Sequence, residues 1–143
     1  MEILLTHEKG LLFSGANSTG TRVSIGRPGD YPEATSPMEL LLEALAGCSS
    51  IDVLMILEKQ KARVDRYQVR VVGHREEVGA AKPFTAVDME YSVDTDALPA
   101  KVARALQLSL EKYCSVAKTI ERSVAIHYAL VVNGQPVEFP EKE

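Results

Sequence analysis

Short apolar runs separated by polar, glycine-containing turns occupy the first part of the chain. The runs lie at residues 3–6, 11–14 and 22–25. Apolar or β-branched runs bounded by turn residues predict three short β-strands. Residues 26–37, which contain three prolines and two glycines, are predicted to form a loop.

The pattern changes to helical periodicity at Ser36. Ser36 suits the N-cap, Pro37 suits the first helical position, and Glu39 completes a capping box. The predicted helix runs to about Lys61, and apolar residues lie on nearly all of its faces. A helix of this kind must be covered from several directions.

Strands and a second helix are predicted for the rest of the chain. Alternating patterns predict strands at residues 67–72, 84–93 and 124–132. Pro99 begins a helix that reaches Cys114, where Ser115 is expected to cap a further turn over residues 116–122. Because strands cluster in groups along the chain, we expect an α+β fold with antiparallel strands, in a single domain spanning residues 1–143.

Size and composition suggest a homodimer. The 143 residues, 45% of them hydrophobic, are enough for one domain with a real core. About six strands in so small a domain can hardly cover a helix that is apolar on all sides. Two chains that sandwich their helices between their sheets would cover it.

The net charge and the first residues of the chain exclude several classes of protein. A net charge of −4 and a pI near 5.4 argue against nucleic-acid binding. The start shows no basic segment or cleavage site, so no secretory signal is expected. Glu43 and Asp52 interrupt the apolar stretch 40–57, which favours a buried helix over a membrane span. We therefore expect a cytoplasmic protein without a membrane partner.

The two cysteines are the candidate reactive groups. Cys48 and Cys114 each lie in a predicted helical segment. A buried cysteine commonly acts as a small hydrophobic residue, whereas two cysteines in a reducing compartment also suit a redox pair. Gly47, beside Cys48, costs about 1 kcal/mol relative to alanine in a helix, so another helix or a small ligand is expected to approach its backbone. The residues alone leave both interpretations open.

Two motifs around these cysteines resemble the OsmC/Ohr family, most closely its YhfA-like branch. Residues 36–52 read SPMELLLEALAGCSSID, and residues 110–117 read LEKYCSVA. The resemblance implies an intertwined homodimer, with antiparallel sheets packed around two central helices and active sites at the dimer interface. It implies reduction of small organic hydroperoxides, with Cys48 as the peroxidatic thiol, Cys114 as the resolving thiol and a lipoyl-type dithiol as the reductant.

One position departs from the family pattern. Family members with established peroxidase activity carry a glutamate directly after the proline, where this chain has Met38. Glu39 follows, but its expected role is in the capping box. The family also pairs that glutamate with an arginine near the thiolate, for which Arg22, Arg27 and Arg75 are the candidates, each in or beside a loop.

Asp52, one helical turn after Cys48, has two interpretations. A buried carboxylate is costly unless it is paired, and unpaired it would disfavour a neighbouring thiolate. It either orients an arginine beside Cys48 or is a structural group bonded to the backbone or to a hydroxyl such as that of Tyr113.

No metal or other cofactor is expected, because His7, His74 and His127 lack the spacing of metal ligands. Two other functions remain as alternatives. One is a dimer of the same fold that binds a small hydrophobic ligand and has little peroxidase activity. The other is a thiol–disulfide oxidoreductase.

Overall fold

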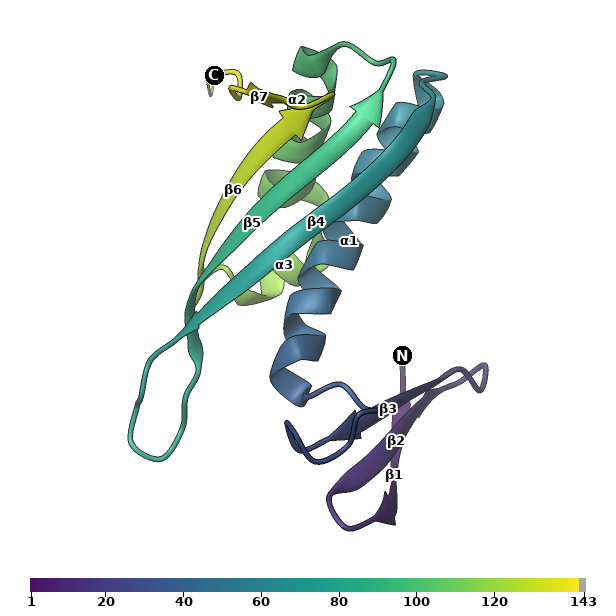
Figure 1. The fold of residues 1–143 in the computed structure, drawn as a ribbon, viewed down its shortest axis with the longest axis vertical. Helices are drawn as coiled ribbons and strands as arrows, with labels where there is room; N and C mark the ends of the chain where they lie inside the picture. The colour runs from purple at the N-terminus through teal and green to yellow at the C-terminus, as the bar shows by residue number, and fades with distance from the viewer. Residues whose placement is uncertain (142–143) are drawn as a thin grey trace. The chain divides into compact units, whose positions relative to one another are not determined.

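A computed structural model describes residues 1–141 and has an α+β architecture (Figure 1). The elements in chain order are β1 (Ile3–Lys9), β2 (Leu12–Asn17), β3 (Arg22–Gly26), α1 (Pro37–Lys59), β4 (Val64–Arg75), β5 (Phe84–Thr95), α2 (Pro99–Leu108), the π-helical turn η1 (Ser109–Tyr113), α3 (Ser115–Ile120), β6 (Ala125–Val132) and β7 (Gln135–Val137). Two compact units, Met1–Leu41 and Leu42–Glu143, make up the chain. The single domain expected from the sequence stays a prediction.

The N-terminal unit is a three-stranded antiparallel sheet in the order β1-β2-β3. Gly10, in the turn between β1 and β2, has a φ of 50°. A side chain there would collide with the Tyr31 hydroxyl, which accepts a hydrogen bond from the Leu11 N–H at 2.9 Å. The proline-containing loop after β3 therefore folds back over this turn and requires a glycine there.

The C-terminal unit contains a four-stranded sheet in the order β4-β5-β6-β7. The predicted strands at residues 67–72 and 84–93 lie in β4 and β5, which form an antiparallel hairpin with a long connection, and β6 and β7 are also antiparallel. However, β5 and β6 are parallel, so the prediction of antiparallel strands is wrong for this pair. The chain returns from β5 to β6 through α2, η1 and α3, and a helical crossover of this length joins parallel strands.

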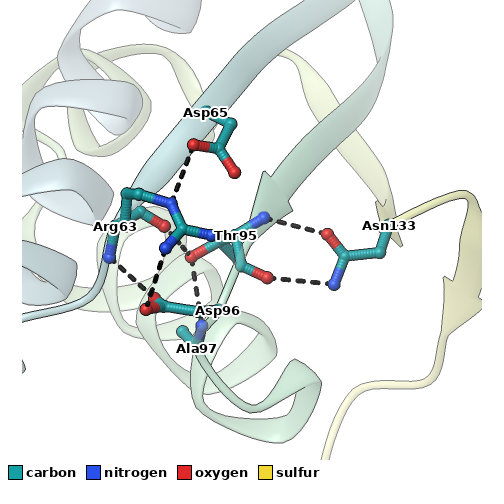
Figure 2. Close-up of polar contacts among 6 residues, drawn as sticks. All are labelled: Arg63, Asp65, Thr95, Asp96, Ala97 and Asn133. Atoms are coloured by element: carbon teal, nitrogen blue, oxygen red, sulfur yellow. Dashed lines mark hydrogen bonds and ion pairs between the residues drawn. The ribbon is translucent and has the colours of Figure 1, made fainter.

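A polar network fastens the end of this sheet (Figure 2). The Thr95 hydroxyl donates to the Arg63 carbonyl at 2.6 Å, and the Arg63 N–H donates to Asp96 at 2.7 Å. Asn133 accepts from the Thr95 N–H and donates to its carbonyl, at 2.9 and 3.0 Å. Asn133 has a φ of 51° and Gly134 a φ of 80°, which suit the Asn-Gly turn between β6 and β7.

The core of the C-terminal unit lies between the sheet and α1 and α2, which cover the same face of it (Figure 1). From β5 it takes Val87, Met89, Tyr91 and Val93; from α2, Val102, Ala103, Ala105 and Leu106.

The C-terminal unit buries one stripe of α1. Its buried residues are Leu45, Ser49, Val53 and Leu57, spaced four apart. Ile51 and Met55 lie on another face and are 62% and 52% exposed. Among the described residues, α1 is the one helix that is long and apolar enough to cross a membrane. Core helices of soluble proteins meet the same two criteria. That another chain covers the exposed faces of α1 stays a prediction.

Candidate active site

Cys48 and Cys114 come together in the C-terminal unit, although they lie 66 positions apart in the chain. Cys48 is half-buried on α1, and Cys114 is fully buried directly after η1; both are free thiols. The Cys48 side chain lies close enough to the Cys114 thiol to raise its pKa, as expected for two thiols that approach each other. Their roles as a redox pair stay a prediction.

The surroundings of Cys114 favour its neutral form. Burial raises the pKa of the Cys114 thiol from its ordinary value of 9.0 to about 11. The backbone N–H of Ala117 acts in the opposite direction, and the adjacent Cys48 raises the pKa further. Cys114 is therefore protonated at neutral pH.

Cys114 owes its position to the wide turn η1. The Cys114 N–H donates to the Ser109 carbonyl at 2.7 Å, which closes a five-residue turn at the end of α2. At Cys114 the backbone becomes extended, and the sulfur accepts the Ala117 N–H at 3.4 Å. The N-cap of α3 is thus Cys114 and not Ser115, because an N-cap needs this extended backbone conformation, which Cys114 adopts.

Asp52 is hydrogen-bonded to a residue that the sequence analysis did not select. The Ser109 hydroxyl lies 2.8 Å from the Asp52 carboxylate and 3.1 Å from the Ser49 carbonyl. This supports the interpretation of Asp52 as a structural group, with the Ser109 hydroxyl as its partner. The suggested partner Tyr113 is 53% exposed. A serine within the apolar stripe of the second helix was the available signal, because a buried hydroxyl needs a partner.

Two tyrosines of the sheet lie beside this stretch of α1. The Tyr91 and Ser49 hydroxyls are hydrogen-bonded at 2.6 Å, and burial raises the pKa of Tyr91. Burial raises the pKa of Tyr67 to about 12, although the nearby Ser50 side chain acts in the opposite direction. Among the described residues, the buried Tyr67 hydroxyl has no hydrogen-bond partner of good geometry. The sequence analysis predicted the strands that carry these tyrosines but no role for their hydroxyls.

Glu39 and the three candidate arginines have partners of their own. Ser36 and Glu39 form the predicted capping box at 3.2 and 3.3 Å, and hydrogen bonds from Ser36 lower the pKa of Glu39. Arg22 donates to Ser14, Arg27 pairs with Asp30, and Arg75 donates to the Lys82 carbonyl. An arginine beside Cys48 stays a prediction.

Two histidines that are far apart in the sequence meet on the outer face of the sheet. His74 and His127 lie 2.6 and 3.1 Å from the Asp88 carboxylate, and their hydrogen bonds lower the pKa of Asp88. Strand pairing places His127 opposite Asp88, which sequence spacing does not reveal. In the described part of the chain, no three His, Cys, Asp or Glu side chains are grouped so as to hold a metal ion.

Residues 28–129 match the family model described as OsmC-like protein. Protein YhfA of Escherichia coli (strain K12) is 40% identical over 126 residues, which are 87% of this chain and 92% of that protein. A hypothetical protein from Aquifex aeolicus has a TM-score of 0.80 at 27% identity, over 98% of this chain and 97% of its own. An organic hydroperoxide resistance protein OsmC from Legionella pneumophila shares the fold, with a TM-score of 0.67 at 16% identity, over 92% and 98% of the two chains.

Proposed function

Since the chain belongs to the OsmC-like family, we propose that it reduces small organic hydroperoxides through Cys48 and Cys114. The contact between the half-buried Cys48 thiol and the fully buried Cys114 thiol carries this proposal. The name of the Legionella neighbour, an organic hydroperoxide resistance protein, supports the substrate class.

The proposed oxidation takes place in two steps. The Cys48 thiolate attacks the O–O bond, so that an S–O bond forms and the departing alkoxide leaves, after protonation, as an alcohol. The sulfur is oxidised to a sulfenic acid while the hydroperoxide is reduced. Cys114 then attacks the Cys48 sulfur, an S–S bond replaces the S–O bond, and the hydroxyl leaves as water with the proton of Cys114.

A dithiol completes the cycle. Two thiol–disulfide exchanges restore both cysteines and convert the dithiol into its own disulfide. We propose a dithiol of the lipoyl class, as the family resemblance implies.

The unequal surroundings of the two thiols support these roles. With a pKa of about 11, Cys114 is a neutral thiol at pH 7 and competes poorly for hydroperoxide. It is also fully buried, whereas Cys48 is partly accessible. Cys48 therefore reacts first, and Cys114 retains a proton for the water that leaves in the second step.

The proposal includes a cytoplasmic homodimer in which a second chain covers the open face of α1. A Cβ built on Gly47 would meet no atom within 4 Å, so the C-terminal unit does not itself supply the expected close approach. A partner chain or a substrate beside Cys48 would supply it. An arginine of either chain would then stabilise the Cys48 thiolate.

A small-molecule binding protein of the same fold is the second candidate. Met38 stands where the active family members carry a glutamate, and Glu39 is engaged in the capping box with Ser36. Glu39 is therefore poorly placed to replace the missing carboxylate. In this case the open apolar face beside Cys48 would hold a hydrophobic ligand without reducing it.

Consumption of cumene hydroperoxide with dihydrolipoamide as reductant tests the proposal. Wild type should turn over, Cys48→Ser should be inactive, and Cys114→Ser should consume one equivalent and then stop. Mass spectrometry of the stalled Cys114→Ser protein should show Cys48 as the sulfenic acid, and as the sulfinic acid only where a second equivalent of hydroperoxide has been consumed, because no second thiol traps the sulfenic acid. Turnover by Cys48→Ser at the wild-type rate, or an inactive wild type, would contradict the proposal.

A further inference from the structure

A single π-helical turn separates α2 from Cys114. In η1 the hydrogen bond runs from the Cys114 N–H to the carbonyl five residues earlier, that of Ser109. Such wide turns are rare and occur frequently at functional sites. Here the extra residue changes the direction in which the chain presents the Cys114 thiol, so something must hold the turn in this form.

Ser109 is the residue that connects this turn to α1. Its side chain is fully buried, and its hydroxyl lies 2.8 Å from the Asp52 carboxylate. The hydroxyl has one proton, and the carboxylate is the stronger of its two neighbouring acceptors, since bonds to charged groups are about twice as strong as neutral ones. Ser109 thus bonds to Cys114 through its carbonyl and to the turn after Cys48 through its hydroxyl.

We infer that Ser109, held by Asp52, is a positioning residue that sets the Cys114 thiol against the Cys48 thiol. The redox role of the pair rests on the proposed function, but the positioning does not. Without the Ser109–Asp52 hydrogen bond, η1 is free to relax and the two sulfurs separate. Disulfide formation between Cys48 and Cys114 then slows, while the attack of Cys48 on the oxidant keeps its rate.

Diamide measures this step without a hydroperoxide. A thiolate adds to its N=N bond, and the second thiol displaces the adduct, so that two thiols give a disulfide and the diazene is reduced to a hydrazine. Stopped-flow measurement with thiol counting separates adduct formation from ring closure. Ser109→Ala should slow ring closure by about tenfold, because small misplacements of reacting groups carry penalties of this order or larger.

Asp52 provides a matched pair of variants. Asp52→Asn and Asp52→Ala both remove the charge, but only asparagine keeps an oxygen that accepts from Ser109. Asp52→Asn should close the disulfide near the wild-type rate, and Asp52→Ala should be as slow as Ser109→Ala. In the double variant Ser109→Ala/Asp52→Ala the two losses should not add, because both remove the same hydrogen bond.

Thr95→Ala is the control for a general loss of stability. It removes another buried, hydrogen-bonded hydroxyl, at the distal end of β5, and should leave ring closure unchanged. Equal ring-closure rates in wild type, Ser109→Ala and Asp52→Ala would overturn the inference, as would equal slowing by Thr95→Ala. If Ser109→Ala does not fold, the Asp52 pair decides. A wild type that reacts with diamide but not with cumene hydroperoxide would refute the proposed function and leave this inference standing.

Discussion

The two sides of α1 carry similar apolar side chains but have opposite surroundings. Leu45, Val53 and Leu57 are buried in the core beneath the chain's own sheet, whereas Ile51 and Met55 are largely exposed. An apolar sequence pattern therefore indicates that a helix must be covered, but it does not identify the element or chain that covers it. The sheet of the C-terminal unit covers one side, and cover of the other side by a second molecule stays a prediction.

Cys48 and Asp52 lie at the border between these sides. At 100° per residue, they fall between the buried stripe that contains Leu45 and the exposed side that contains Ile51. Cys48 therefore reaches the buried Cys114 while remaining partly accessible from the open side. A redox thiol at this border can meet an outside substrate and an inside partner.

The largest effect is expected from a charge on the open side. Ile51→Asp should dissociate the proposed homodimer, because an unpaired carboxylate in an apolar interface is costly. Light scattering after size exclusion at micromolar concentration should show half the wild-type molar mass. Val78→Asp, which also replaces an exposed apolar residue, should retain it. Equal masses for wild type and Ile51→Asp would break the comparison.

Truncation on the two sides should differ in kind. Leu45→Ala should lower the free energy of unfolding by about 3 kcal/mol, because it leaves a cavity in the core. Ile51→Ala should act through association, so its cost should grow with protein concentration in urea unfolding. Similar, concentration-independent losses from both variants would show that the same kind of packing covers both sides.

The pKa of Cys114 predicts how stability depends on pH. Since the folded state raises this pKa from 9.0 to about 11, the neutral thiol contributes stability that is complete below pH 9. That contribution should be lost as the pH rises from 9 to 11, because the unfolded chain gives up the proton first. Thermal melts of wild type should decline by a few degrees more over this window than those of Cys114→Ser. Parallel declines would contradict the assigned burial of this thiol.

The smallest effect is expected at the start of α1. Ser36→Ala should cost about 1 kcal/mol, because it removes the side-chain acceptor for the Glu39 N–H. Glu39→Gln keeps the reciprocal acceptor for the Ser36 N–H and should cost less. Urea unfolding measures both, and a larger loss for Glu39→Gln would assign Glu39 a role beyond capping.

Local rules were sufficient to predict several features. The capping box depends on residues three apart, so Ser36 and Glu39 could be predicted from their spacing alone. The hairpin of β4 and β5 likewise follows from two alternating runs in succession. The contact of Cys48 with Cys114 was predicted from two motifs of a family resemblance, because spacing does not determine a contact over 66 positions.

Features that depend on three-dimensional packing were missed. Whether β6 lies parallel or antiparallel to β5 depends on the path of the helices between them, which the strand pattern does not contain. The π turn adds one residue to a continuous helical pattern, so its place could not be predicted from periodicity. The sequence analysis therefore placed Ser109 within a continuous helix and did not foresee its bond to Asp52.

The long separation of the two cysteines also affects the unfolded chain. A disulfide between Cys48 and Cys114 would close a loop of about 66 residues. By lowering the conformational entropy of the unfolded chain, it would raise the free energy of the unfolded state by about 4 kcal/mol. The oxidised protein would then resist heat better than the reduced one. The melting temperature would then report the fraction of the protein that is in the disulfide form and has not yet been reduced.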